Sequence, residues 1–490
     1  LSLRSKVKFG GSLEINFGGR VLVLGAGSVA QCTLPLILKH FAKPSQVTII
    51  DKDDRTNRIK REIEQGVTFK VDQITKENLN TKLSTYLSSG DLLLDLAWNI
   101  DCNAILQWCH DNNVKYLNTS VEEWNPYVDG ANRPVLDRTL YPRHMRIREM
   151  MKTWDKKGPS AVVEHGANPG LVSHFTKACL VDIADKLIKE NKSNEQINKA
   201  LQDEKYNELA HLLGVKVIHI AERDTQITNK PKQVDEFVNT WSVEGFYEEG
   251  IAPAEIGWGT HEKQLPKNAS MHTGNGPCNQ IAIAQPGAKT WVRSWVPDFE
   301  TIGMVIRHGE AFTITEHLTV KDSSGKDVYR PTVHYAYCPA NEAIVSMTEL
   351  EMRQWDLQKN QRILNEEIID GEDRLGVLLM GHEYKAWWYG SMLSIHDARK
   401  LVPGQSATTL QVACSVIAAA MWMIENPNEG VLVPDQLPWK YVLDIAKPYL
   451  GEMKSVQVDW SPIKTRNDLY KGLNSRIYDE DPWQFSNFLV

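Results

Sequence analysis

A chain of 490 residues exceeds what one hydrophobic core usually organises, so two or three domains are expected. Its net charge of −7, from 62 acidic and 55 basic residues, provides no basic surface for nucleic acid or an anionic membrane, and neither partner is expected. The seven scattered cysteines contain no C-x-x-C pair, which argues against a disulfide framework or a zinc site and favours a cytoplasmic protein. No charged and then apolar leader precedes residue 20, so export is not expected.

Short apolar, β-branched runs alternate with polar segments of helical length through the first third of the chain. The runs lack polar alternation, which is typical of strands covered on both faces in a parallel, doubly wound sheet. We therefore predict an α/β protein whose residues 1–166 form a Rossmann-type domain. The predicted strands are residues 20–25, 47–51, 67–72, 92–98, 114–120 and 161–166.

The pattern changes over residues 167–375. A helical stretch at 171–213 is followed by strand-like runs, such as 214–222 and 299–318. We predict a second, α+β domain with a mixed sheet over this range.

The last part of the chain, residues 376–490, is predicted as a helical return to the first domain plus a C-terminal extension. Residues 376–430 are hydrophobic and read as helical. Their longest apolar run, 410–424, is shorter than the roughly 20 residues that a membrane span needs. We interpret this run as a buried helix.

The segment "VLVLGAGSVAQ" carries a glycine fingerprint between a strand and a helix. Gly25 and Gly27 open the helix, and Ala30 takes the third position of G-x-G-x-x-G/A. Without a Cβ at these glycines, the backbone can turn tightly and approach a pyrophosphate, which the amides at the helix N-terminus bind. The alternative is a glycine turn without a ligand.

Asp51 ends the next apolar run, where a carboxylate accepts hydrogen bonds from an adenosine ribose diol and repels a 2′-phosphate. Asp53 and Asp54 add negative charge, whereas Arg55 and Arg58 favour the opposite choice. We predict NAD as the cofactor in preference to NADP.

Three later strands of the predicted sheet end in polar residues, at 97–99, 118–124 and 164–170. Because ligands of such sheets bind at the carboxyl ends of the strands, these segments should line the site. Pro169 restricts Asn168, whose amide could address nicotinamide or substrate, or "NPG" could be a simple turn. The predicted cofactor-binding residues are Gly25, Gly27, Ser28, Val29, Asp51, Asp53, Ala97, Trp98, Thr119, Ser120, Asn168 and Pro169.

Residues 237–259 interleave aromatic rings with glutamates and contain no lysine or arginine. Aromatic faces and carboxylates together suit an organic ammonium ion such as a polyamine, because both compensate its lost hydration. The alternative is an ordinary surface with partly buried aromatics. Glu222 could add a carboxylate, and the lone His308 could be structural or catalytic. No H-E-x-x-H or Cys/His cluster is present, so no metal is predicted.

Five segments together resemble one known family: "VLVLGAGSVAQCTLPLI", "NTSVEEW", "EHGANPGLVSHF", "NTWSVEGFYEEG" and "SATTLQVACSVIAAAMWMIENP". The family is the bacterial homospermidine synthases, within the saccharopine-dehydrogenase-like superfamily. The resemblance implies an NAD-dependent homodimer that joins two putrescines, or spermidine and putrescine, into homospermidine-type products and releases ammonia. It also implies that the second domain carries catalysis and dimerisation.

The resemblance further implies site residues, matched position by position. Trp241 corresponds to a cation–π tryptophan, and Glu249 or His308 is the candidate general base. Adjacent acids leave Glu123 and Glu248 as alternates. The implied substrate-binding residues are Glu122, Glu222, Trp241, Glu249 and His308, and the implied catalytic residues are Glu249, His308, Asn168 and Trp241.

The implied chemistry is a borrowed-hydride cycle. The cofactor would accept hydride from an amine-bearing carbon, a second amine would displace ammonia from the resulting iminium, and the hydride would return. A carboxyspermidine- or saccharopine-type reductase is the alternative within the superfamily, and it should carry pocket arginines, which residues 237–259 lack. A non-catalytic NAD-sensing regulator is the alternative from another class.

Overall fold

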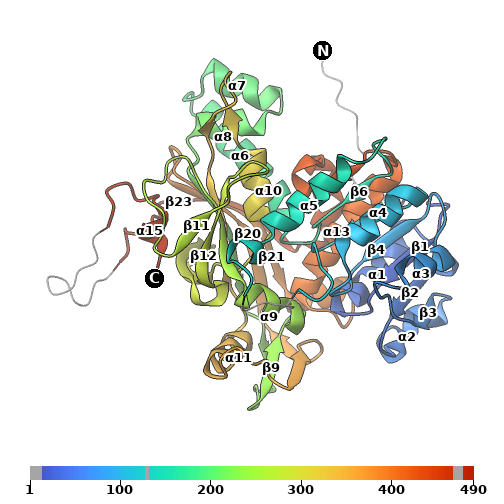
Figure 1. Ribbon diagram of the computed structural model, residues 1–490. Helices are drawn as coiled ribbons and strands as arrows, with labels where there is room; N and C mark the ends of the chain where they lie inside the picture. Colours follow the sequence, from blue (N-terminus) through green and yellow to red (C-terminus); the bar gives the residue numbers. More distant parts are fainter. Residues whose placement is uncertain (1–13, 127–131, 467–477) are drawn as a thin grey trace.

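The computed structural model describes residues 14–126, 132–466 and 478–490. Its first domain is built on a seven-stranded sheet with the order β22-β6-β5-β4-β1-β2-β3, in which every neighbouring pair is parallel (Figure 1). This arrangement confirms the predicted Rossmann-type class. The strands are β1 (Val21–Leu24), β2 (Val47–Asp51), β3 (Thr68–Val71), β4 (Leu92–Asp95), β5 (Lys115–Asn118), β6 (Ala161–Val162) and β22 (Val431–Leu432).

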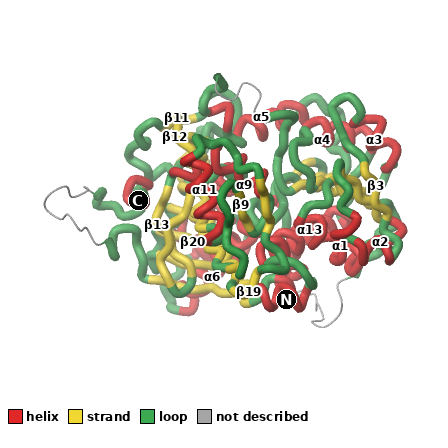
Figure 2. The backbone as a smooth tube through the Cα atoms, turned by 90° about the horizontal axis from the view of Figure 1, so that it is seen from below, coloured by secondary structure: helices red, strands yellow, loops and turns green. Residues whose placement is uncertain are grey.

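Helices from both ends of the chain cover this sheet. Helix α13 (Ala407–Glu425) packs against α1 (Ser28–His40) and against β5, and Figure 2 shows the two helices side by side. By length and composition α13 could cross a membrane, but 83% of its apolar window is buried inside the molecule, as expected of a core helix. The other helices of this part are α2 (Lys60–Glu64), α3 (Leu79–Tyr86), α4 (Cys102–Asn112), α5 (Tyr141–Met151) and α14 (Trp439–Ala446).

The second domain contains a ten-stranded mixed sheet. Its main path is β11-β12-β10-β17-β7-β20-β21-β23, while β14 pairs with β13 and β17. Strands β17 and β7 are parallel, and the other pairs are antiparallel. The strands are β7 (Val217–Asp224), β10 (Pro253–Gly257), β11 (Ala269–Met271), β12 (Gln280–Pro286), β13 (Trp291–Val296), β14 (Phe299–Met304), β17 (Thr332–Cys338), β20 (Glu372–Met380), β21 (Ala386–Ser394) and β23 (Glu452–Val458).

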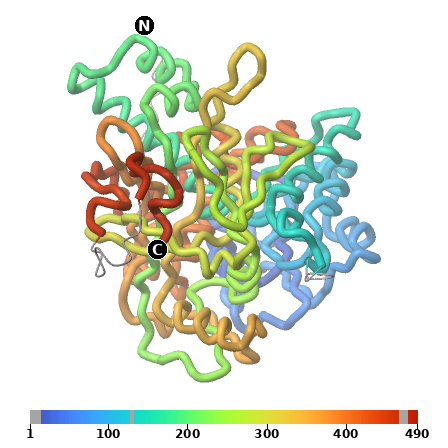
Figure 3. Tube along the Cα trace, turned by 60° about the vertical axis from the view of Figure 1, so that its left-hand side comes forward, coloured from blue at the N-terminus to red at the C-terminus, as the bar shows by residue number. Residues whose placement is uncertain are grey.

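Helices α6 (Leu171–Lys189) and α10 (Glu310–His317) pack on the mixed sheet, α6 on β20 and β21 and α10 on β17 and β10. The C-terminal residues, red in Figure 3, return to it: α15 (Phe485–Phe488) contacts β13, and Leu489 bridges to Val292. The remaining helices are α7 (Glu195–Gln202), α8 (Tyr206–Leu213), α9 (Val243–Ile251), α11 (Asn341–Met352) and α12 (Ile395–Leu401), and the short strand β9 (Glu236–Asn239) precedes α9.

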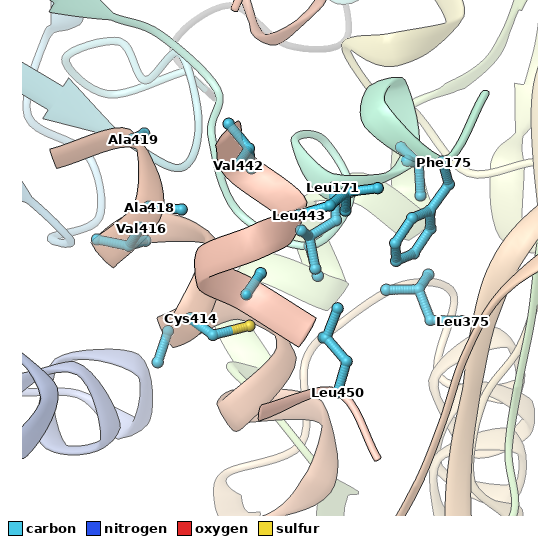
Figure 4. Close-up of a cluster of buried hydrophobic side chains, with 14 of the residues drawn as sticks. Leu171, Phe175, Leu375, Cys414, Val416, Ala418, Ala419, Val442, Leu443 and Leu450 are labelled. Atoms are coloured by element: carbon cyan, nitrogen blue, oxygen red, sulfur yellow. The ribbon is translucent and has the colours of Figure 1, made fainter. Parts of the chain in front are cut away.

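One apolar core joins the two domains. Figure 4 shows Cys414 of α13, Leu443 of α14 and Phe175 of α6 in the same cluster, with Leu375 of β20 beside them. These four side chains are fully buried. Because α6 and β20 belong to the second domain, burial of this cluster fixes the two domains against each other.

Two secondary-structure predictions are wrong. Residues 376–394, read as helical, form the end of β20 and all of β21, and only the first part of 299–318 is a strand, since α10 follows. A strand buried on both faces shows the same unbroken apolar run as a buried helix, so periodicity does not separate them. The domain limits at 166 and 375 stay predictions.

Candidate active site

A cavity of about 190 Å³ lies where the carboxyl ends of the first sheet face the second domain. From the first domain it is lined by the segments that follow β4, β5 and β6, as expected for ligands of this fold. The sequence-predicted residues in its lining are Val29, Ala97, Trp98, Thr119, Ser120, Glu122, Asn168, Pro169, Glu222, Trp241, Glu249 and His308. The structure therefore brings all predicted substrate residues together.

The glycine loop leaves the N-terminus of α1 open. Gly25 has φ +84°, and a Cβ there would lie 2.9 Å from the carbonyl oxygen of Leu96. Within the described ranges of the chain, a Cβ at Gly27 would meet no atom within 4 Å, and no side chain caps the N-terminus of α1. These features fit a dinucleotide, because its pyrophosphate needs close access to free backbone amides.

Asp51 lies directly beside this loop. Its Oδ2 accepts a hydrogen bond of 2.7 Å from the backbone N–H of Ala26, and its Oδ1 accepts one from Asp53. The Asp53 side chain is exposed and pairs with Arg55 at 3.0 Å. Asp51 is therefore the carboxylate placed for a ribose at the glycine loop, whereas Asp53 is paired at the surface. Neither acid lines the cavity itself, nor do Gly25, Gly27 and Ser28.

Asn168 is held in the turn that leads into α6. Gly170 has φ +130°, and a Cβ there would lie 1.9 Å from the carbonyl oxygen of Gly166, so only glycine fits. The side-chain amide of Asn168 donates a hydrogen bond of 2.9 Å to Oε2 of Glu222. This contact links the end of β6 to β7 in the second domain.

Glu222 lies close to a second buried acid, Asp373, which the sequence analysis did not single out. The Tyr335 hydroxyl donates a hydrogen bond to Glu222, and the Thr408 hydroxyl donates one of 2.6 Å to the nearby Asp373. Burial raises the pKa of Glu222 to about 7, although the Tyr335 hydrogen bond lowers it. Burial and then the charge of Glu222 raise the pKa of Asp373 well above its usual range. Within the described part of the chain, no lysine or arginine forms an ion pair with Glu222 or Asp373.

The neighbouring acids Glu122 and Glu123 differ in position. Glu122 lines the cavity, accepts a 2.7 Å hydrogen bond from Ser120, and has its pKa raised to about 7 by burial and by Glu248. Glu123 is outside the lining and pairs with Arg143 at 3.2 Å and with Arg146. Glu122 is thus the acid available to a ligand.

Glu248 is compensated by two arginines. Its Oε1 accepts hydrogen bonds from Arg143 (2.9 Å) and Arg307 (2.6 Å), and its Oε2 accepts one from the Trp98 indole (3.1 Å). Burial would raise the pKa of Glu248, but Arg307 and Arg143 lower it to about 2. The expectation of an arginine-free pocket, based on residues 237–259 alone, is therefore wrong, because α5 and the segment after β14 supply arginines.

His308 is flanked by two carboxylates. Its Nε2 lies 2.9 Å from Oε2 of Glu249, and its Nδ1 lies 3.2 Å from Oε1 of Glu310. Burial would lower the pKa of His308, but Glu249 and Glu310 raise it well above its usual range. The ring is therefore an imidazolium in the ligand-free site, with no basic nitrogen to offer.

Trp241 lies between β9 and α9, beside the acids. Its Nε1 donates a 2.9 Å hydrogen bond to the hydroxyl of Tyr337, and Tyr337 stacks on Tyr335 with ring centroids 5.1 Å apart. A Cβ at Gly245 would lie 3.2 Å from the Trp241 ring, so this glycine gives the indole its space. Among the described residues, no lysine or arginine stacks over Trp241.

Known proteins match this chain over nearly its whole length. Residues 21–162 match the family described as saccharopine dehydrogenase NADP binding domain, and residues 166–458 match the saccharopine dehydrogenase C-terminal domain. The homospermidine synthases of Mesorhizobium japonicum and Blastochloris viridis are each 41% identical to the chain, over 96% of it and 96% and 97% of their own lengths.

A solved relative agrees with this assignment. The homospermidine synthase of Legionella pneumophila, in complex with NAD, is 40% identical, covers 98% of this chain and 99% of its own, and has a TM-score of 0.86. Identity at this level over the whole length shows the family. The chain belongs to the homospermidine synthases, within the saccharopine dehydrogenase family.

Proposed function

We propose that the cavity binds putrescine as a diammonium ion, with NAD on the glycine loop, and makes homospermidine with release of ammonia. The observation that carries this proposal is the charge of the lining. Glu122 and Glu222 are buried or nearly so, line the same cavity, and form no ion pair with a lysine or arginine of the described chain. A ligand with two ammonium groups would supply the missing positive charge.

The cofactor would be bound by residues of the first domain. Gly25, Gly27 and Val29 would hold the pyrophosphate, and Asp51 the adenosine ribose, which favours NAD over NADP. When bound, NAD supplies a hydride acceptor and afterwards a hydride donor, so that no net oxidation occurs. The NAD bound to the Legionella enzyme supports this choice.

The acids and rings of the second domain would bind the reacting carbon as it becomes cationic. An iminium is stabilised where carboxylates and an aromatic face converge, which matches Glu222 beside Trp241. An amine must lose a proton before it donates hydride or attacks. Because the pKa of Glu222 is about 7, we assign Glu222 as the base for this proton.

His308 would act in the opposite direction. Since Glu249 and Glu310 hold it as an imidazolium, it can donate a proton to the departing ammonia. The resemblance implies Glu249 or His308 as the general base. In this proposal neither residue takes the first proton from the amine, and His308 together with Glu249 serves as the general acid. Asn168 orients Glu222 through its amide.

We also propose a homodimer, with the second domain as the dimerisation domain, and a cytoplasmic location. The dimer rests on resemblance to the family, and the location rests on the scattered cysteines without a C-x-x-C pair. Light scattering of the purified protein tests the assembly: a mass of twice 55.6 kDa supports it, and a mass of 55.6 kDa contradicts it.

The function is tested with putrescine as sole substrate and NAD below the enzyme concentration, following homospermidine and ammonia by mass spectrometry and an ammonia assay. Product in molar excess over NAD supports the borrowed-hydride cycle. Accumulation of NADH with one oxidised amine per NAD contradicts the return of the hydride. Bound but unreduced NAD without product contradicts the function, and carboxylated amines are then tested as substrates. Their turnover favours a carboxyspermidine- or saccharopine-type reductase, and no turnover of any amine favours an NAD-sensing regulator.

A further inference from the structure

Arg143 and Arg307 meet at one buried carboxylate oxygen. The Nη2 atoms of Arg143 and Arg307 lie 2.9 Å and 2.6 Å from Oε1 of Glu248. All three side chains are at most 7% exposed, and all three line the cavity. They come from α5, from the segment after β14, and from α9, so the cluster is assembled by the fold.

The two guanidinium groups are also anchored independently of Glu248. Arg143 donates through Nη1 to the carbonyl oxygen of Val121 at 2.7 Å, and Arg307 donates through Nη1 to the carbonyl oxygen of Arg138 at 2.9 Å. Loss of the Glu248 carboxylate would therefore leave both groups in place at the cavity wall.

One of the arginines is incompletely used. The Nε of Arg307 is buried and has no hydrogen-bond partner within the described chain. Nε and Nη2 form the side of a guanidinium that accepts a carboxylate through two parallel hydrogen bonds, but Glu248 engages only Nη2. The Arg307 guanidinium could therefore bind a carboxylate through two hydrogen bonds, whereas Glu248 accepts only one from it.

We propose that Arg143 and Arg307 form a latent carboxylate-binding site, and that Glu248 occupies it as a built-in carboxylate that restricts the cavity to amines without carboxyl groups. A carboxylated diamine would have to displace Glu248, which would leave that buried acid without its cations. The selectivity half of this proposal rests on the proposed function, whereas the binding half does not.

The binding half is tested without turnover. Glu248→Ala removes a CH₂–COO⁻ group, so acetate has the size and charge to replace it, while acetamide has the size alone. We expect acetate, and not acetamide, to raise the melting temperature of Glu248→Ala with half-saturation in the millimolar range. Glu123→Ala is the matched control, because Glu123 also pairs with Arg143 but lies outside the cavity lining.

Equal shifts with acetate and acetamide, or the same acetate shift in the wild-type protein and in Glu123→Ala, would overturn the proposal. If Glu248→Ala is unstable, its folded yield is compared after purification in acetate or in acetamide. Recovery in acetate alone supports the site, and equal yields contradict it.

The selectivity half uses inhibition of putrescine turnover by ornithine, a diamine with an α-carboxylate. We expect its inhibition constant to fall at least tenfold in Glu248→Ala, and the gain to disappear when Arg307→Ala is added. Failure here with a positive acetate result would count against the proposed substrate orientation. Failure of the acetate result would count against the latent site itself.

Discussion

Glu222 and Glu248 line the same cavity and are buried to a similar degree, but their pKa values differ widely. Two arginines pair with Glu248 and lower its pKa to about 2. Among the described residues no lysine or arginine pairs with Glu222, and burial raises its pKa to about 7 although Tyr335 and the nearby His308 lower it. Burying a carboxylate without a cation is unfavourable. The charge of Glu248 is therefore compensated by arginines of the protein itself. The charge of Glu222 lacks such a partner within the described chain, and we propose that a cationic ligand compensates it.

The largest expected effect is on the free energy of unfolding when the charge of Glu248 is removed. We expect Glu248→Gln to destabilise the protein by about 3–5 kcal/mol, because it removes the carboxylate that pairs with buried Arg307 and leaves Arg143 with Glu123 alone. Urea denaturation at pH 8 without ligands measures this. A loss below about 1 kcal/mol would contradict the role of Glu248 as the internal counter-ion.

Glu222→Gln is the matched substitution with the opposite expected sign. Gln keeps an acceptor for Tyr335 and Asn168 and removes the charge, so the ligand-free protein should gain up to about 3 kcal/mol at pH 8. Homospermidine formation should nevertheless fall by roughly 100-fold or more in kcat/KM, since the base and ammonium partner are lost. Unchanged turnover would remove Glu222 from the mechanism.

The pH dependence of stability follows from the same pKa values. The pKa values of Glu122 and Glu222 are raised from 4.5 to about 7, so the native state binds more protons than the unfolded state between these values. The free energy of unfolding of the ligand-free protein should therefore decrease as pH rises from about 4.5 to 7 and level off above. The double variant Glu122→Gln/Glu222→Gln should show a smaller decrease, and an equal slope would contradict these assignments.

Trp241 tests the aromatic part of the site. We expect Trp241→Ala to weaken putrescine binding and kcat/KM by about 1–2 kcal/mol, through loss of the cation–π contact. Trp241→Phe keeps a ring and should lose less, although its hydrogen bond to Tyr337 is gone. Equal losses in both variants would attribute the effect to the hydrogen bond.

Asp51 tests the cofactor side of the site, with an expected effect on NAD binding alone. Asp51→Ala removes the acceptor for a ribose and for the Ala26 amide, and should weaken NAD binding by about 1–2 kcal/mol. Fluorescence titration with NAD measures this, with Asp53→Ala as the control because Asp53 pairs with Arg55 at the surface. Equal effects in the two variants would contradict the assignment of Asp51.

The sequence predicted the features that local patterns carry. Six of the seven strands of the first sheet, the glycine loop and the buried helix α13 were found because each depends on neighbouring residues alone. Strand β22 was missed, since its two residues join β6 from 270 positions away. Residues 376–394 were misread because a fully buried strand has no alternation.

The site residues also fall into those that local sequence patterns indicate and those that depend on distant parts of the chain. The segment around Trp241 and the pair 248–249 were noticed from composition, but which acid is free depends on arginines 105 and 59 positions away. Asp373 stands in the charged run 372–374 at the start of β20, and Tyr335 lies in the buried strand β17, so no local pattern marks either residue as a neighbour of Glu222. Compensation of charge is a tertiary property, so the sequence could propose the acids without ranking them.

Glu122 and Glu222 are proposed to bind the two ammonium groups of one ligand. Calorimetric titration of the protein with putrescine at pH 7, without NAD and in buffers of different ionisation enthalpy, measures protons exchanged on binding. We predict proton release in the wild-type protein, because ammonium groups lower the pKa of both acids, and a clearly smaller release in the Glu122→Gln/Glu222→Gln variant. Proton uptake, or the same release from both proteins, would contradict the account.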